Sequence, residues 1–257
     1  MTTALLPPTP DRAEAVALGE HAAFVELISG LSPGEWDKPT DCAGWSVRDV
    51  VAHVAGALEE GAHIRAQLRR VALAPRRYPQ LDRLDAINQL QVDDRGAHPP
   101  DRLVHEVSSL GPRAARARRR TPQLIRSRAV PRGFSLPTGA TFGYLVDVIY
   151  PRDLWMHRID VARATNRDLR ATSTEADVVA LVVRDLACTW GGPATTLTLT
   201  GHGAGTWALG AGKPVAAVET DAVEICRHLS GRIASPPIAA KGDPGAEQYL
   251  LAARIPF

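Results

Sequence analysis

The spacing of apolar residues changes near residue 170, and this change governs the domain organisation that we predict. Before residue 170, apolar side chains recur every three or four positions, which is typical of amphipathic α-helices. After it, short apolar and threonine-rich segments broken by glycine are typical of β-strands. We therefore expect a helical domain over residues 1–170 and a small α+β domain over residues 171–257.

The predicted elements follow from these two patterns. In the first domain, helices are expected over residues 11–31, 47–58, 81–92, 101–120 and 141–164. In the second domain, strands are expected over residues 195–200, 206–209 and 215–218, and helices over 176–187 and 221–229. Residues 70–80 and 131–139 are expected to be loops.

Local signals refine the helix boundaries. Ser46 followed by Asp49 resembles a capping box at the start of the second helix, and Thr172 followed by Glu175 predicts another. Pro151 should kink or break the last helix of the first domain, because proline lacks an N–H group and clashes with the preceding turn.

Composition and charge exclude several classes of protein. The 257 residues are 45% hydrophobic and 23% charged, as expected of a globular protein that buries its core without disulfides. A net charge of +2 is too small to indicate nucleic-acid binding, and no apolar run is long enough to cross a membrane. Three cysteines without a CxxC pair and an N-terminus without a signal peptide favour a reducing cytoplasm.

Two histidines and one acidic residue could form a metal site. Asp153 and His157 lie four residues apart on a predicted helix, so their side chains share one face, and Asp160 continues that face. His53, expected on the flank of another helix, could supply a third ligand. Two imidazoles and one carboxylate leave open coordination positions, as catalytic zinc sites require. By spacing alone, the same residues could instead form a solvated polar stripe or an intrahelical ion pair.

Longer motifs resemble those of a known family. Residues 36–53, with the pattern WxxPTxCxGWSVRDVVAH, resemble the opening motif of the mycothiol-dependent maleylpyruvate isomerase family, which is part of the DinB-like metalloenzymes. Three further segments resemble other parts of the same family, namely residues 85–88 (DxxN), 153–160 (DLWMHRID) and 221–232. The resemblance covers nearly the whole chain.

The resemblance implies both a fold and a set of metal ligands. The implied fold is mainly α, with a DinB-like four-helix bundle followed by a small sterol-carrier-like α+β domain. The implied ligands of one divalent metal ion are His53, Asp153 and His157, with Zn²⁺ expected and Fe²⁺ or Ni²⁺ as alternatives. The family usually has glutamate where this chain has Asp153, whose shorter side chain requires the helix to lie closer to the metal.

The resemblance also implies a reaction. A divalent cation deprotonates a thiol that coordinates it, and the family's thiol is mycothiol. We therefore expect an enzyme that activates a low-molecular-weight thiol for S-transfer to, or thiol-assisted isomerisation of, a small electrophile. A metal-dependent hydrolase and a non-catalytic binding protein that keeps the metal site are the alternatives. We expect a monomer or homodimer without nucleic-acid or membrane partners.

Other residues have less specific expected roles. Asp160 and Asp49 could accept the second ring N–H of a ligand histidine, although capping already explains Asp49. Arg83, Asn88 and Arg232 could bind an anionic substrate or cofactor.

Two remaining features are expected to be unrelated to catalysis. The arginines within residues 113–128, including Arg118, are expected to form a solvated helix end. Cys42 has no partner that the sequence makes evident.

Overall fold

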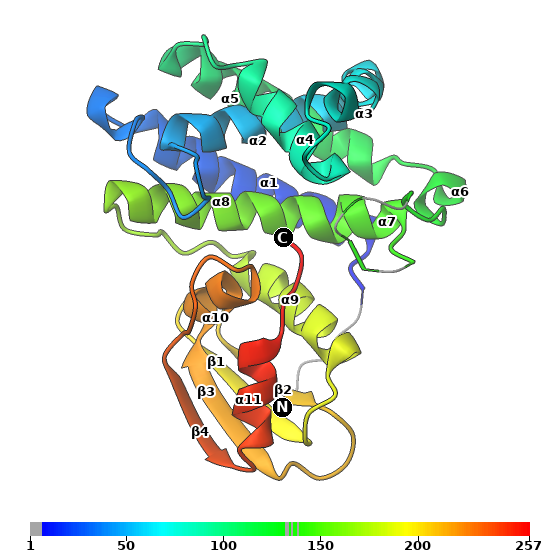
Figure 1. Cartoon of the computed structure of the whole chain (residues 1–257), viewed down its shortest axis with the longest axis vertical. Helices are drawn as coiled ribbons and strands as arrows, with labels where there is room; N and C mark the ends of the chain where they lie inside the picture. Colours follow the sequence, from blue (N-terminus) through cyan, green and yellow to red (C-terminus); the bar gives the residue numbers. More distant parts are fainter. Residues whose placement is uncertain (1–6, 132–133, 135, 138) are drawn as a thin grey trace. The chain divides into compact units, whose positions relative to one another are not determined.

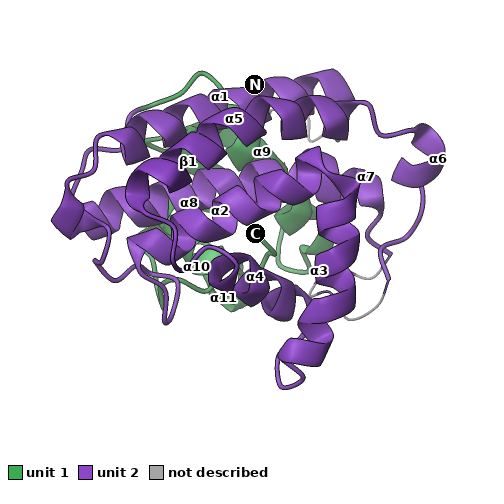
Figure 2. Cartoon of the chain, turned by 90° about the horizontal axis from the view of Figure 1, so that it is seen from above, with its two compact units in different colours: residues 1–8, 171–257 green, residues 9–170 purple. Residues whose placement is uncertain are grey.

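The chain folds into two compact units in the computed structural model, which describes residues 7–131, 134, 136–137 and 139–257 (Figure 1). Thr9–Arg170 form a helical unit, and Ala171–Phe257 belong to an α+β unit (Figure 2). This mainly helical structure with one small sheet confirms the predicted fold class. Residues 132–133, 135 and 138 of the expected loop lie outside the described residues. Within the described part of the chain, no helix is long and apolar enough to cross a membrane.

The helical unit is built on a bundle of four helices, each of which packs against two of the others. These helices are α1 (Pro10–Ser29), α2 (Val47–Ala62), α5 (Pro100–Arg119) and α8 (Tyr150–Thr165). Their facing sides bury a common apolar core that includes Phe24, Val50, Val54, Leu103, Val107 and Leu154. Because burial of apolar surface is the main favourable contribution to folding, this core holds α2 against α8.

The start of α2 is fixed by the predicted capping box. Ser46 Oγ accepts a hydrogen bond from the Asp49 N–H at 3.3 Å, and Asp49 Oδ2 accepts one from the Ser46 N–H at 2.9 Å. α2 is buried on more than one side, because α4 (Arg83–Asp93) packs on it in addition to the bundle helices. His53, predicted on the flank of the apolar face, is consequently only 4% exposed and lies in the interior.

The prediction of a loop over residues 70–80 is wrong for the first part of this segment. α3 (Ile64–Arg77) covers residues 70–77, and only the turn before α4 is non-helical. The apolar pattern hides this helix because Leu68 is exposed, whereas the buried residues of α3 are Ala74 and the ion-paired Arg70. Two short helices lie in other connections, η1 (Pro33–Glu35) and α6 (Gln123–Arg126).

The interruption predicted at Pro151 takes the form of a π-helical turn. α7 (Phe142–Tyr144) and the π-helical segment η2 (Leu145–Ile149) lead directly into α8. Pro151 lies in the first turn of α8, where a missing N–H group costs little. The wider π-turn just before it accommodates the proline ring, so the helix changes its hydrogen-bond pattern and does not end.

The α+β unit contains a four-stranded sheet with the order β2-β1-β3-β4. β1 (Thr195–Thr200) pairs antiparallel with β2 (Gly205–Leu209) and parallel with β3 (Ala216–Asp221). β3 pairs antiparallel with β4 (Ile238–Gly242). The helices of this unit are α9 (Glu175–Thr189), α10 (Ala222–Leu229) and α11 (Gly245–Ala252).

Two features of the α+β unit differ from the prediction. β4 and α11 were not predicted; β4 is an edge strand whose residues are mostly exposed, so they show no alternation. The predicted capping box at Thr172 is wrong, because Thr174 is the N-cap of α9. The two threonine hydroxyls lie 3.2 Å apart and interact with each other.

Candidate metal centre

The bundle brings the three predicted ligands together. His53 comes from α2, and Asp153 and His157 lie one turn apart on α8. His157 Nε2 lies 3.2 Å from Asp153 Oδ1, and His53 Nε2 lies 3.5 Å from Asp153 Oδ2. One potential ligand atom from each residue lies within 4.8 Å of the other two. Both histidines are 4% exposed, so the group faces the interior of the bundle.

The second nitrogen of each imidazole is occupied. His53 Nδ1 lies 2.7 Å from Gln91 Oε1, and His157 Nδ1 lies 2.9 Å from Asp160 Oδ2. Because both partners are acceptors, each Nδ1 carries the hydrogen, and in the neutral ring the lone pair is on Nε2, facing Asp153. This is the arrangement that ligand histidines have in metal sites.

One of these partners was predicted and one was missed. Asp160 was expected to accept from a ligand histidine, and it accepts from His157. Asp49 does not take this role for His53, because its Oδ2 accepts from Ser46. Gln91, which does, was missed. Its signal was a polar residue at a buried position of α4, beside Leu90.

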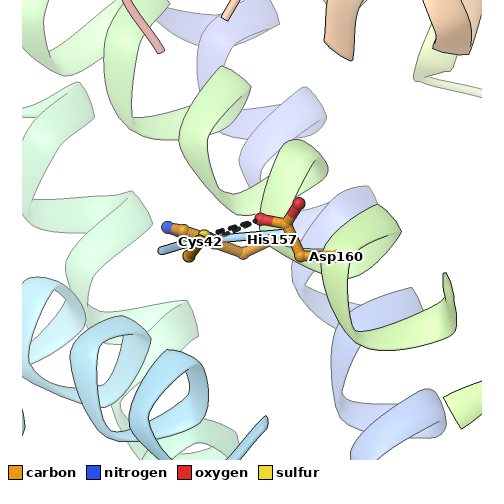
Figure 3. Close-up of side chains that lie close together, drawn as sticks. All are labelled: Cys42, His157 and Asp160. Carbon is orange, nitrogen blue, oxygen red and sulfur yellow. Dashed lines mark hydrogen bonds and ion pairs between the residues drawn. The ribbon is translucent and has the colours of Figure 1, made fainter. Parts of the chain in front are cut away.

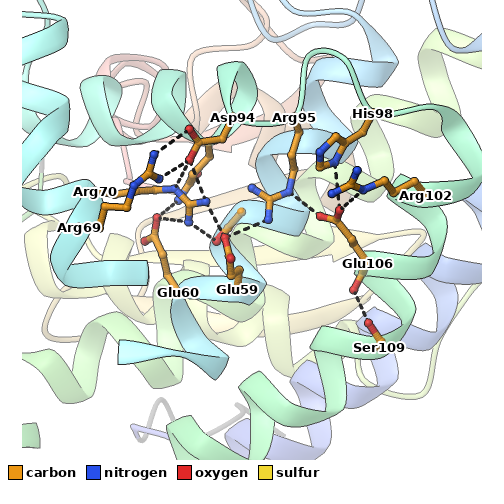
Figure 4. Close-up of polar contacts among 12 residues, drawn as sticks. Glu59, Glu60, Arg69, Arg70, Asp94, Arg95, His98, Arg102, Glu106 and Ser109 are labelled. Atoms are coloured by element: carbon orange, nitrogen blue, oxygen red, sulfur yellow. Dashed lines mark hydrogen bonds and ion pairs between the residues drawn. The ribbon is translucent and has the colours of Figure 1, made fainter. Parts of the chain in front are cut away.

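Gln91 is itself fixed by a buried polar network. Its Nε2 donates to Glu60 Oε1 at 2.7 Å, and the same oxygen accepts from Arg70 Nη1 at 3.2 Å. Figure 4 shows the network continuing from Arg70 to Glu59 and Asp94. These contacts tie α4 and α3 to α2, so the position of His53 depends on residues far from it in sequence.

Cys42 lies at the edge of the site, contrary to the expectation that it had no partner. Its Sγ donates to Asp160 Oδ2 at 3.2 Å and lies 3.8 Å from His157 Nδ1 (Figure 3). Cys42, His157 and Asp160 therefore form a second group of potential ligands, which shares His157 with the first. His157 faces Asp153 with Nε2 in the group with His53, and it faces Cys42 with Nδ1 in the group with Asp160.

The charges of the site depend on one another. Burial alone would raise the pKa of Asp153, but the imidazoles of His157 and His53 lower it well below its usual range. Burial alone would lower the pKa of His157, but Asp153, Asp160 and Cys42 raise it well above its usual range. Asp153 therefore favours a positive charge at the position that His157 Nε2 faces.

The donor set fits a divalent metal. In a tetrahedral site with bonds of about 2.0–2.1 Å, neighbouring ligand atoms lie about 3.3 Å apart. Asp153 Oδ1 lies 3.2 Å from His157 Nε2 and Asp153 Oδ2 lies 3.5 Å from His53 Nε2, so each histidine has a different carboxylate oxygen at close to this spacing. Aspartate therefore reaches both imidazoles, although it is one methylene shorter than glutamate. The ring of Trp45 covers the site, with its centroid 5.1 Å from that of His53.

The structure does not link the other predicted residues to this group. Arg83 is exposed at the start of α4, and Asn88 is half-buried on the same helix. Arg232 follows α10 in the other unit. Their proposed contacts with an anionic substrate or cofactor stay predictions. Arg118 contradicts its predicted place at a solvated helix end, because it is buried.

Comparison with known proteins agrees with the resemblance seen in the sequence. Residues 17–162, more than half of the chain, match the family model described as the mycothiol maleylpyruvate isomerase N-terminal domain. No curated protein matches the chain.

Two solved structures have a similar fold. One is the crystal structure of the mycothiol-dependent maleylpyruvate isomerase, with 16% identity and a TM-score of 0.56. The other is a histidine-to-alanine mutant of that isomerase, with 17% identity and a TM-score of 0.55. Each comparison covers 95% of this chain and 98% of the other. The match of the family model over most of the helical unit shows that the chain belongs to the mycothiol maleylpyruvate isomerase N-terminal domain family.

Proposed function

We propose that this chain is a metal-dependent enzyme that activates mycothiol, or a similar small thiol, for reaction with a small electrophile. The observation that carries the proposal is the convergence of His53, Asp153 and His157 within 4.8 Å, with both Nδ1 atoms already engaged. Membership of the family supports the choice of thiol. The proposed metal is Zn²⁺, with Fe²⁺ or Ni²⁺ as alternatives.

The residues of the chain have separate roles in this proposal. His53, Asp153 and His157 bind the cation, which supplies a thiolate at neutral pH by lowering the pKa of a coordinated thiol. Gln91 and Asp160 fix the orientation of the two imidazoles. Two neutral histidines and one carboxylate leave a net charge of about +1 with a divalent ion, which favours an anionic sulfur.

The proposal includes two outcomes for the electrophile. In an isomerisation, the thiolate adds to a conjugated double bond, rotation occurs about the resulting single bond, and the C–S bond then breaks to return the thiolate. In an S-transfer, the C–S bond persists and the adduct takes up one proton from solvent. The solved structures of similar fold are described as an isomerase, which makes isomerisation the first choice.

Calorimetric titration with mycothiol tests the proposed thiol. The zinc-loaded chain should bind mycothiol with 1:1 stoichiometry, and the metal-free chain should bind it at least about tenfold more weakly, since the metal–sulfur bond is lost. S-methyl mycothiol, which cannot form a thiolate, is the matched control. A zinc-loaded chain that binds neither compound, yet hydrolyses small esters or amides, would support the hydrolase instead. Zinc loading without thiol binding or turnover would favour a binding protein.

Metal binding should release about one proton per site near pH 7. In the metal-free chain, the pKa of His157 is raised well above its usual range, so its imidazole is protonated at that pH. A metal ligand must be neutral, and the proton has to leave. The release should fall towards zero above the pKa of His157, and metal affinity should increase with pH until that point.

This proton release can be measured by zinc titration in two buffers of different ionisation enthalpy. The difference in observed heat between the buffers gives the number of protons released. Equal heats at pH 7 would mean that His157 is already neutral in the metal-free chain, which contradicts the charge distribution proposed for the site.

A further inference from the structure

Arg118 is a buried cation that forms no ion pair among the described residues. Its side chain projects from α5 into the helical unit and is 8% exposed. Nη2 donates to the carbonyl oxygen of Ala57 at 3.0 Å. Among the described residues, Nε has no hydrogen-bond partner and no carboxylate forms an ion pair with the guanidinium. The guanidinium carbon lies 3.8 Å from the centre of the Tyr150 ring, a contact that stabilises a cation but does not neutralise it.

Two other buried arginines of the same unit form ion pairs with acidic residues. Arg158 forms an ion pair with Glu20 at 3.1 Å, and both side chains are almost fully buried. Arg126 forms an ion pair with Asp147. Burial of an unpaired charge is costly, and it lowers the pKa of Arg118, although guanidinium stays charged in proteins. Arg118 differs from these two arginines, because the charges of Asp153 and Glu60 and the Tyr150 ring favour its cation without forming an ion pair with it.

The backbone makes room for this guanidinium. A Cβ atom on Gly61 would lie 2.8 Å from Arg118 Nε and 2.9 Å from Nη2, so any larger residue there would displace the charge. The glycine on α2 thus permits a close approach of α5 that places the guanidinium beside the centre of the bundle.

The guanidinium lines a small cavity that reaches the metal site. The cavity has a volume of about 20 Å³, and its lining includes Arg118, Tyr150, Asp153 and the apolar side chains of Val54 and Leu58. One water molecule requires roughly 10–15 Å³ by this measure, so the cavity accepts one or two water-sized groups, such as the oxygens of a carboxylate. It therefore connects an unpaired cation with the carboxylate that we assign to the metal.

We propose that Arg118 and this cavity bind the carboxylate, or a similar small oxyanion, of the electrophilic substrate. The inference rests on the proposed function for the identity of the ligand as the substrate. A guanidinium can pair its Nε–H and an Nη–H with the two oxygens of one carboxylate, and Nε is the atom left without a partner. Tyr150 stays protonated, since burial raises its pKa to about 12, and adds no negative charge. Asp153 would repel the anion until a metal neutralises it.

Acetate, with uncharged acetamide as its isostere, probes this site directly. Titration of the ¹⁵N-labelled full chain, metal-free and zinc-loaded, should shift the Nε–H resonance of Arg118 saturably with acetate and leave it in place with acetamide. Zinc should tighten acetate binding. Arg118→Met should weaken acetate binding by about tenfold or more, because a charge-assisted pair is lost.

Thermal unfolding separates this role from a structural one. Arg118→Met should leave the Tm of the metal-free chain unchanged or higher, because it removes a buried charge that forms no ion pair among the described residues. Arg158→Met, the matched control, should lower Tm by roughly 10 °C because it removes a buried ion pair with Glu20, and it should keep acetate affinity.

Two results would overturn the inference: an Arg118 Nε–H resonance that ignores acetate in both metal states, or an Arg118→Met variant that loses stability as Arg158→Met does while its acetate affinity stays unchanged. Acetate binding at Arg118 in a chain that fails to bind mycothiol would leave the anion site standing and remove the thiol function. Mycothiol binding with no acetate response at Arg118 would support the thiol function and refute the anion site.

Discussion

Replacement of His157 by alanine should remove the metal and abolish turnover. His157 Nε2 is one of three groups that converge on the site, and its Nδ1 is fixed by Asp160. With two ligands left, stoichiometric metal should fall from about one per chain to near zero. Loss of a Lewis acid that contributes about 4 kcal/mol or more would reduce kcat/KM by roughly 10³-fold. Metal analysis of the purified variant and steady-state kinetics with mycothiol measure the two effects.

His105→Ala is the matched control for this experiment. His105 is an exposed histidine on α5, so its replacement should leave both metal content and kcat/KM at the level of the unmodified chain. Circular dichroism should show native helix content for both variants. The assignment of the ligands is refuted if His157→Ala keeps stoichiometric metal, or if the unmodified chain binds no divalent metal at all.

The bundle helices could be predicted because their apolar stripes alone indicate which side is buried. On α5, Leu103, Val107 and Ala114 are buried as their spacing predicts. The stripe then continues at Arg118, four residues after Ala114, and not at Ala117, which is exposed. The helical periodicity thus indicated that position 118 is buried, but an arginine at that position was interpreted as a solvated residue.

Elements held by polar contacts could not be predicted in the same way. α3 exposes Ile64 and Leu68 and buries Arg70, so its apolar pattern points away from its packed side. Its packing depends on ion pairs between Arg70 and acids of α2 and on its contacts with α4. These partners lie in other elements, and a single sequence does not show which acids will approach a given arginine.

In the candidate site, too, local patterns predicted some residues, and contacts between distant segments determine the others. The spacing of Asp153 and His157 on one helix placed two groups together, whereas His53, on another helix, was only a possible third ligand until the resemblance of its motif supported it. Gln91 and Cys42 were not predicted as partners because they are 38 and 115 residues away from the histidines they contact. Contacts of this length depend on how α4 and the segment before α2 pack, which local patterns do not encode.

Gly56→Ala tests the packing that supports His53, and it should destabilise the chain. On an exposed helix face this change usually stabilises a protein by up to about 1 kcal/mol. Here a Cβ atom would lie 2.5 Å from Gln91 Cβ and 2.6 Å from its Cγ, so α4 or the glutamine must move. Overpacking of this kind costs about 1–3 kcal/mol, which corresponds to a decrease in Tm of roughly 3–10 °C.

The same substitution should also weaken metal binding, because Gln91 is the residue that fixes His53. The 2.7 Å hydrogen bond from His53 Nδ1 to Gln91 Oε1 lengthens or breaks when the glutamine shifts, and loss of such a partner costs about 10- to 100-fold in metal affinity. Competition with a chelating dye measures this affinity. Gly96→Ala, where the nearest atom to a new Cβ is 3.8 Å away, should change neither quantity. A Gly56→Ala chain with raised Tm and unchanged metal affinity would show that His53 needs no support from α4, and that the two imidazoles are positioned by the bundle alone.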